Sequence, residues 1–364
     1  MTRDLHLVST RSVAAVMPEN GAVDCAALLD GLALPLDAAS LPDATRQVIA
    51  ACPSLPQPGG GHTLARWQFL AGLAGRDLSL VKIYEAHADA LAILAEIGAP
   101  RTCAAGADSA TPPIWAVWAA RAPHDDLRFT HTRGSNDETR VLLSGTKPWC
   151  SGAAFVTHAL VTCIDDEGRD WLAALPLDQP GVTVTGRGWE AVGMAATRSV
   201  EVEVRNAHAT LIGASGAYLR RAGFWQGGAG IGACWYGAAA ALAVHLRHAA
   251  QRRDDPHLHA HLGAADTALV AARAVLREAA QHLDAHPQDD AMTLALRVRA
   301  AVESAVETVL TACARGLGAG PYCRDAWFAR MAADLPVFVR QSHAERDLAA
   351  LAKAVAERGE DWAL

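Results

Sequence analysis

The feature that most constrains the fold is a change of periodicity along the 364 residues, from helical to strand-like and back to helical. From residue 24 to 98, apolar residues recur at i, i+3, i+4 and i+7, as in TLARWQFLAGLAG and LSLVKIYEAHADALAILAEIG, and this pattern predicts helices. The segment PSLPQPGGGH (53–62) interrupts them and is typical of a loop. We therefore expect an N-terminal helical domain over residues 1–111.

Seven short apolar or alternating runs follow between residues 113 and 207, each bounded by Gly, Pro, Asp or Asn. Runs of this length with such boundaries are typical of strands. They predict a central antiparallel β-barrel or sandwich domain over residues 112–210. The runs are IWAVWAA, DLRFTHT, TRVLLSG, FVTHALVTC, DWLAALPL, VTVTGR and SVEVEVR.

Helical periodicity returns in four long segments, at 223–250, 262–285, 289–316 and 323–357. Long helices with short connections pack as antiparallel neighbours, so we expect a C-terminal four-helix bundle over residues 211–364 and an α+β fold class. Residues 222–246 contain no Asp, Glu, Lys or Arg and are long enough to span a bilayer. Because Gly and Ala dominate this stretch, a helix buried inside the bundle is the favoured interpretation.

Composition narrows the classes of function. A net charge of −7 argues against nucleic acid as the main partner. The eight cysteines form no CxxC pair, which indicates reduced thiols rather than a disulfide framework or a zinc site. We therefore expect no metal site. The N-terminus MTRDLHLVST lacks the apolar core of a secretory signal, so we expect a cytoplasmic protein.

Three segments resemble motifs of one family. LSGTKPWCSGA (143–153) resembles a segment in which Gly-x-Lys precedes an aromatic residue and a Thr or Ser near a flavin. GWEAVGMAATRSVEVEVRNAHA (188–209) resembles a Gly-Met loop and its following strand, and GLGAGPYCRD (316–325) resembles a glycine-rich turn before the last long helix. Together with the order of helices, β domain and bundle, they make the chain resemble the acyl-CoA dehydrogenase superfamily over most of its length.

The resemblance implies FAD as cofactor. Trp149 would lie beside the isoalloxazine, and the Ser151 hydroxyl or nearby amides would hydrogen-bond its polar edge. Gly152 would allow the backbone to approach the ring closely. The structural alternative for Trp149 is simple packing at the end of the barrel, and Ser151–Gly152 is also an ordinary turn pair.

The resemblance also places more distant residues at the cofactor. Arg247 matches an arginine near the FAD pyrophosphate, where a charge-assisted contact is favourable, although it could equally be a solvated helix-end arginine. Gly318 and Gly320 would contact FAD from a neighbouring subunit. The family assembles through its bundle helices, so the resemblance implies a homodimer or homotetramer.

The chain departs from the family where the base is expected. Acyl-CoA dehydrogenases remove the α-proton of an acyl thioester with a glutamate while the flavin accepts the β-hydride. The two family positions for this glutamate fall on or near Val339 and around Gly227, and neither residue is a carboxylate. The loop with Glu-Pro and Gly-Ser-Asp is also replaced, around residues 120–126.

One substitute for the base comes from flavin monooxygenases of the same fold, in which a histidine near the end of the last helical region assists oxygen chemistry. His343, in RQSHAERDL, is the candidate, and Arg340 would bind an anionic substrate or a flavin oxygen. The alternative for His343 is a solvated or capping histidine. Asp334 and Glu345, in the same segment, are expected to be surface carboxylates or salt-bridge partners.

Three functions remain open. The first is an FAD-dependent oxidoreductase with an unconventional or missing base, acting on a small molecule such as an acyl thioester and passing electrons to a partner. The second is a flavin-dependent monooxygenase that uses oxygen. The third is a non-catalytic relative. The cluster RRAGFWQGGAGIGACWYG (220–237) either shapes a flat pocket or lets helices pack closely. We expect the small-molecule pocket to lie between the β domain and the bundle.

Overall fold

The N-terminal part is helical, as predicted. The computed structural model describes residues 31–98, 112–121, 127–132, 137–359 and 362, and two short strands, β1 (Ala14–Ala15) and β2 (Val23–Asp24). Residues 53–62 form a loop between helices. The helices that the structure describes in this part are α2 (Leu41–Ala51), α3 (Thr63–Ala74) and α4 (Leu78–Ile97).

All seven predicted runs contain a strand. The strands are β3 (Trp115–Trp118), β4 (Arg128–His131), β5 (Arg140–Cys150), β6 (His158–Ile164), β7 (Asp170–Pro176), β8 (Val182–Val184) and β9 (Val200–Leu211). Pairing runs β6–β4–β5–β9–β7 and returns to β6, which closes a small barrel. The expectation of a purely antiparallel domain is wrong, because β3 and β4 both pair parallel with β6. Parallel neighbours need a crossover connection, and here other strands of the barrel supply it.

Helices return after the barrel and form the second half of the chain. The predicted helix over residues 323–357 is wrong, because the structure divides it into separate elements. Pro336 lacks an N–H donor and lies in the last turn of the central piece, and Ser342 then adopts an extended backbone (φ −69°, ψ 143°). The elements are α5 (Ala217–Arg220), α6 (Gly223–Arg252), α7 (Pro256–Ala285), α8 (Met292–Leu317), α9 (Ala319–Arg324), α10 (Ala326–Phe338), η3 (Val339–Gln341) and α11 (Glu345–Arg358).

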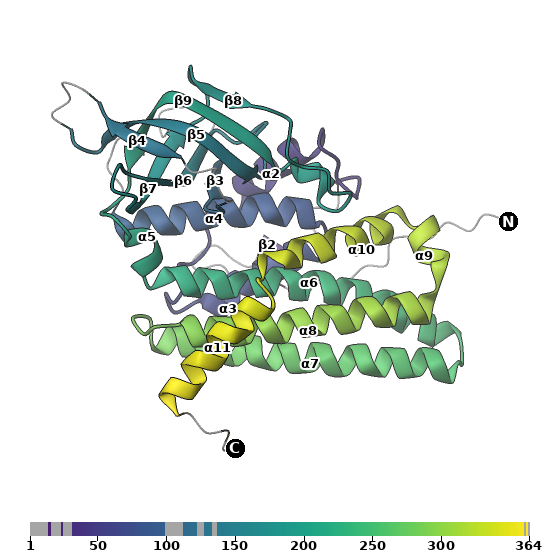
Figure 1. The fold of residues 1–364 in the computed structure, drawn as a ribbon. Helices are drawn as coiled ribbons and strands as arrows, with labels where there is room; N and C mark the ends of the chain where they lie inside the picture. The colour runs from purple at the N-terminus through teal and green to yellow at the C-terminus, as the bar shows by residue number, and fades with distance from the viewer. Residues whose placement is uncertain are drawn as a thin grey trace.

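The elements stack in layers (Figure 1). The barrel lies against α4, which lies above α3 and α6, and α7 and α8 form the layer farthest from the barrel. Helix α6 approaches α3 so closely that a Cβ on Gly237 would clash with the carbonyl oxygen of Ala71. Within the described residues α6 is the one helix long and apolar enough to cross a bilayer, and 67% of its most apolar window is buried.

A buried histidine joins α4 to the barrel. The backbone N–H of Trp115, at the start of β3, donates to Nδ1 of His87 on α4 at 3.2 Å. Burial lowers the pKa of His87 to about 4, so the ring stays neutral at neutral pH and its Nδ1 remains an acceptor.

Candidate functional site

The turn that ends β5 presents a large aromatic side chain to solvent. Trp149 is 48% exposed and has a φ of 54°, in the left-handed region that bulky residues avoid. Such a conformation costs on the order of 1–3 kcal/mol and persists only where the surroundings impose it. The surroundings here include Trp118, whose Nε1–H donates to the Ser151 carbonyl at 3.2 Å. Trp149 is therefore held outside the core rather than packed at the barrel end.

A chain of hydroxyl groups leads inward from this turn. The Ser151 Oγ lies 2.8 Å from the Ser199 Oγ, which lies 2.9 Å from Thr197 Oγ1. Thr197 Oγ1 donates to the carbonyl oxygen of Met194 at 2.8 Å, and the Gly152 N–H donates to the Thr197 carbonyl at 2.9 Å. The two segments that resemble flavin-site motifs, 143–153 and 188–209, are thus joined by side-chain and backbone hydrogen bonds.

The Gly193–Met194 loop is pressed onto α10. A Cβ on Gly193 would clash with the Ala333 carbonyl oxygen, so only glycine fits there. Met194 has a φ of 56°, and its N–H donates to Oδ1 of Asp334 at 2.5 Å. This contact ties the end of the hydroxyl chain to the bundle.

Asp334 is buried, so the expectation that it is a surface carboxylate is wrong. Asp334 is 1% exposed, and its Oδ2 has no hydrogen-bond partner in the described part of the chain. Burial raises the pKa of Asp334 to about 7, with a further upward contribution from Asp77, while the Met194 N–H and Arg330 oppose it. The carboxyl of Asp334 therefore titrates near neutral pH.

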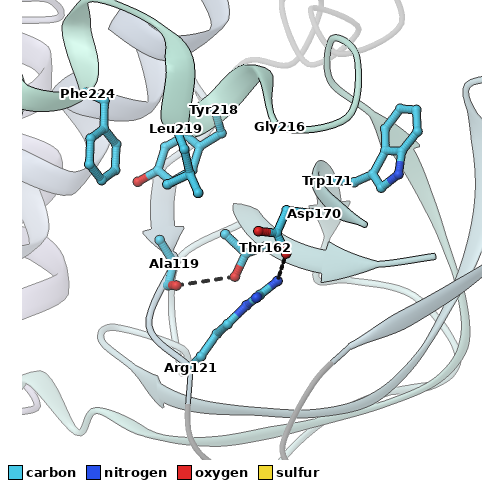
Figure 2. Close-up of a pocket in the computed structure, with 9 residues that line it drawn as sticks. All are labelled: Ala119, Arg121, Thr162, Asp170, Trp171, Gly216, Tyr218, Leu219 and Phe224. Carbon is cyan, nitrogen blue, oxygen red and sulfur yellow. Dashed lines mark hydrogen bonds and ion pairs between the residues drawn. The ribbon is translucent and has the colours of Figure 1, made fainter. Parts of the chain in front are cut away.

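A cavity of about 200 Å³ opens beside the barrel, where β6 and β7 meet α5 and the start of α6 (Figure 2). Tyr218, Leu219 and Phe224 face the strands across it. On the strand side Arg121 forms an ion pair with Asp170 at 2.6 Å. The cavity is therefore mostly apolar, with one charged edge, and Ala119 in its lining is adjacent in sequence to the Trp118 that contacts the Trp149–Ser151 turn.

Charged side chains of α4 face the glycine-rich start of α6. The side chain of Arg66, on α3, is 2% exposed and donates to Oδ1 of Asp89, on α4, at 2.5 Å. A Cβ on Gly227 would lie 3.6 Å from Oδ2 of the same Asp89. One turn earlier Glu85 pairs with Lys82 at 2.5 Å, and burial raises the pKa of Glu85. A carboxylate from α4 thus occupies the space toward which a side chain at Gly227 would point.

At the junction of η3 and α11, both predicted catalytic residues pair with carboxylates. Arg340 forms an ion pair with Glu303 of α8. His343 is 56% exposed in its side chain, its ring Nδ1 lies 3.3 Å from Asp347 Oδ1, and its N–H donates to Asp347 Oδ2 at 3.1 Å. Here the side chain of Asp347, in the first turn of α11, reaches back and accepts from the His343 backbone, so the His343 ring does not cap the helix.

No protein-family model and no curated protein matches the sequence. Solved structures do match. A nitrososynthase from Micromonospora carbonacea var. africana aligns with a TM-score of 0.74 and 21% identity, over 91% of this chain and 95% of that one. KijD3, in complex with FMN and dTDP-3-amino-2,3,6-trideoxy-4-keto-3-methyl-D-glucose, has a TM-score of 0.74 and 20% identity over 97% and 98%. Dibenzothiophene monooxygenase from Paenibacillus sp. A11-2 has a TM-score of 0.69 and 19% identity over 86% and 88%.

The chain has the acyl-CoA dehydrogenase fold. This outcome agrees with the resemblance of the three motif segments. At about one identical residue in five, the likeness establishes the fold and leaves the chemistry to be argued from this chain's own residues.

Within this fold, the two predicted base positions have different surroundings. Val339 is 3% exposed and packs in the core, so this position offers no acceptor to a substrate. Gly227 carries no side chain, but Asp89 lies beside it. Most of the segment that replaces the family's Glu-Pro loop (120–126) lies outside the described residues, since these stop at residue 121 and resume at 127.

The remaining predicted cofactor residues lie apart from the Trp149–Ser151 turn. Arg247 is exposed in the last turns of α6, and Gly318 and Gly320 are exposed where α8 meets α9. The Arg253 Nη2 donates to the Gly316 carbonyl at 3.2 Å, which places both groups at the same end of the bundle. Their contact with FAD remains a prediction. Gly152 has a φ of 72°, and a Cβ there would meet Ile83 of α4 at 2.9 Å, so tight packing also requires this glycine.

Sequence reasoning missed several residues of the site. Asp334 lies on the same face of α10 as Met331 and Phe338, and this apolar stripe could have predicted its burial. Ser199 and Thr197 are within the recognised Gly-Met segment, but their contact with Ser151 depends on strand register. Nothing in the local sequence distinguishes Asp89 from a surface carboxylate.

Proposed function

We propose that this chain is a flavin-dependent oxidoreductase that holds the isoalloxazine against the Trp149–Ser151 turn. The observation that carries the proposal is the exposed indole of Trp149, held at a φ of 54° on the rim of the barrel. A protein core gains nothing from an aromatic in that position, whereas a flat ligand gains a stacking surface.

The residues present fit a flavin. Trp149 supplies an apolar face, and Ser151 supplies a hydroxyl and backbone groups for a polar edge. Bound flavin would supply electron-transfer chemistry that no amino-acid side chain provides. Matched structures of KijD3 and of the Paenibacillus monooxygenase hold FMN, so FMN should be tested as the cofactor as well as the predicted FAD.

We infer monooxygenation as the reaction class: reduced flavin and oxygen would be consumed, one oxygen atom would enter the substrate and the other would leave as water. Two observations support this class. The buried Val339 and the side-chain-free Gly227 leave both glutamate positions of a dehydrogenase without a carboxylate. One matched structure of the same fold is that of dibenzothiophene monooxygenase.

In this proposal the substrate would bind in the cavity of Figure 2. Its volume of about 200 Å³ suits a small molecule, and Tyr218, Leu219 and Phe224 provide apolar and aromatic contacts. The Arg121–Asp170 pair at its edge would orient a polar substituent. An acyl thioester would have to place its long carrier outside this cavity.

Dehydrogenation is the second candidate, and one observation favours it. Asp89 Oδ2 lies 3.6 Å from the position that a Cβ on Gly227 would take. A carboxylate of α4 therefore lies close to the expected position of a base on α6. Arg66 holds that carboxylate in position through Oδ1. In this case Asp89 would accept the α-proton while the flavin accepts the hydride.

Anaerobic mixing separates the two candidates. The flavin-loaded protein is combined with candidate small aromatic and thioester substrates in the absence of oxygen, and absorbance near the flavin bands is followed. Monooxygenation predicts no bleaching of oxidised flavin, and substrate turnover only when reduced flavin and oxygen are both supplied. Bleaching by a thioester that disappears in Asp89→Asn would establish dehydrogenation instead.

A further inference from the structure

The carboxylate of Asp89 has one oxygen already bonded and one oxygen open. Oδ1 accepts from Nη2 of Arg66 at 2.5 Å, and Nη1 of the same guanidinium donates to the Pro56 carbonyl at 3.1 Å. Because Arg66 is 2% exposed and held at both nitrogens, it fixes the orientation of the carboxylate. Oδ2 accepts no hydrogen bond from the described residues, and the Asp89 side chain is 24% exposed. The open oxygen is therefore an oriented acceptor within reach of a ligand.

The helix opposite this oxygen leaves room for a ligand group. Helix α6 carries glycine at 227 and 228, and the three atoms nearest to a Cβ on Gly227 would all belong to the Asp89 carboxylate. The closest of them, Oδ2, would lie at 3.6 Å, which is an ordinary contact distance. A Cβ on Gly228 would meet no described atom within 4 Å. A small group therefore fits between the carboxylate and α6.

The open oxygen lies near the aromatic wall of the cavity in Figure 2. Phe224, in that wall, precedes Gly227 by three residues on α6, so the two positions are neighbours on the helix surface. Burial raises the pKa of Tyr218, in the same wall, to about 12, and the nearby charge of Asp89 adds to this rise while Arg221 opposes it. A flat ligand against these two rings could thus direct its edge at Asp89.

The charges around Asp89 already balance. Arg66 pairs with Asp89, and one turn earlier on α4 Lys82 pairs with Glu85 at 2.5 Å. The two cations and two anions leave this largely buried group without net charge. A protonated amine bound at Oδ2 would add a cation that has no counter-charge, whereas a neutral N–H or O–H group would add none. The surroundings therefore favour a neutral donor.

We propose that Asp89 determines substrate specificity by accepting a hydrogen bond from a neutral N–H or O–H group on an aromatic substrate. The substrate class is a phenol or a heteroaromatic ring that carries N–H, with its ring against Tyr218 and Phe224 and its donor on Oδ2. Arg66 acts as a positioning residue for the carboxylate. An analogue that lacks the donor would leave the acceptor unpaired and be rejected. The proposal rests on the proposed function and deepens it by naming the substrate class.

Matched pairs of ligands test the acceptor role. Indole and 1-methylindole, and phenol and anisole, differ by one donor hydrogen replaced with methyl. Their affinities are measured by calorimetry with flavin-loaded wild type, Asp89→Asn and Asp89→Ala, and with Asp166→Asn, an exposed carboxylate between β6 and β7, as control. Asparagine keeps the shape of the side chain and presents an N–H where Oδ2 stood, since its oxygen takes the Arg66 hydrogen bond.

We expect wild type and Asp166→Asn to bind each donor about tenfold to hundredfold more tightly than its methylated partner, the size of a hydrogen bond to a charged group. Both Asp89 variants should reduce this ratio to about twofold or less, because the steric effect of the methyl group remains and the acceptor is gone. Thermal unfolding of each variant checks that the fold is retained.

Gly227→Ala tests the same place with Asp89 unchanged. The added methyl group fits at 3.6 Å from Oδ2 and occupies the space of the donor, and alanine favours a helix more than glycine does. We expect indole and phenol to bind about tenfold more weakly with no loss of thermal stability. Gly263→Ala, at a glycine of α7 with no described atom within 4 Å of its Cβ position, should match wild type.

Equal donor-to-methyl ratios in wild type and Asp89→Asn would overturn the acceptor role. Tighter binding of protonated 2-phenylethylamine than of phenol by the wild type would contradict the preference for a neutral donor. If the wild type binds flavin but neither indole nor phenol, the substrate class is wrong and the proposed function stands. Failure of the wild type to bind flavin would refute the proposed function itself.

Discussion

The two regions in which the sequence predicted functional residues are built in different ways. On the barrel side, Trp149 and Met194 adopt left-handed backbone conformations, and hydrogen bonds join Ser151 to a buried carboxylate on α10. On the helical side, at the junction of η3 and α11, the predicted catalytic residues Arg340 and His343 are each paired with a nearby carboxylate. The barrel region combines left-handed backbone with a buried polar network, whereas Arg340 and His343 are each satisfied by an ion pair with one carboxylate.

Under the proposed function, the barrel region would hold the ligand, while neither expected base position carries a carboxylate. Val339, at one of these positions, lies in the core. The following predictions would either break this contrast or sharpen it.

The largest expected effect concerns Asp334, on which the barrel side depends. Its pKa is about 7 in the folded protein and about 4 when unfolded, so between these values the folded state holds a proton that the unfolded state has lost. Stability from this group is complete below pH 4 and is lost as the pH rises to 7, by about 4 kcal/mol at most. Asp334→Asn should remove this dependence in urea unfolding at pH 5 and pH 8. Identical pH dependence in wild type and variant would contradict the burial.

His87 should produce an effect of opposite sign. Its pKa is lowered to about 4 from an ordinary value of 6.5, so its contribution is present above pH 6.5 and is lost as the pH falls through 4. The loss amounts to about 3 kcal/mol. His87→Asn can still accept from the Trp115 N–H but does not titrate, and its stability should fall less between pH 7 and pH 4. The same unfolding assay measures it.

Arg340→Ala should have a moderate effect that is confined to stability. It removes the partner of Glu303, whose side chain is only 12% exposed, and we expect a loss of about 1–2 kcal/mol. Flavin affinity should stay unchanged. A tenfold weaker flavin affinity without loss of stability would return Arg340 to the site and break the contrast.

His343→Ala should have the smallest effect. The side chain is half exposed and pairs with Asp347 within one helical turn, so the stability should change by no more than about 1 kcal/mol. Turnover with reduced flavin and oxygen should also be retained. A hundredfold loss of turnover with flavin binding intact would instead make His343 a catalytic residue.

Most elements of the fold could be predicted from the sequence. Bounded apolar runs predicted all seven strands, and apolar periodicity predicted α3, α4 and the long helices α6 to α8, because each pattern reflects which face of an element is buried. The division of residues 323–357 was not predicted, since the sequence beside the break at Ser342 contains neither Gly nor Pro to mark it. The parallel pairing of β3 and β4 with β6 depends on contacts between distant strands, which local patterns do not encode.

The candidate site was predictable only in part. The motif around Trp149 and Ser151 identified the turn, but its side-chain hydrogen bonds depend on Ser199 and Thr197, which lie in the segment just before β9. Asp89 could be recognised as a candidate only from the fold, which brings α4 next to α6. Chemistry built from residues far apart in sequence needs the fold before it can be recognised.

The most direct test of the proposed site is a flavin titration of the purified protein, followed by absorbance from 300 to 550 nm, with Trp149→Ala beside it. Trp362→Ala, which changes a tryptophan that is 89% exposed, serves as the matched control. We predict that wild type and Trp362→Ala bind about one flavin per chain and that Trp149→Ala binds about tenfold more weakly or worse, since a stacking surface is lost. Equal flavin affinity in all three proteins, or no binding by the wild type, would contradict the assignment of this turn as the flavin site.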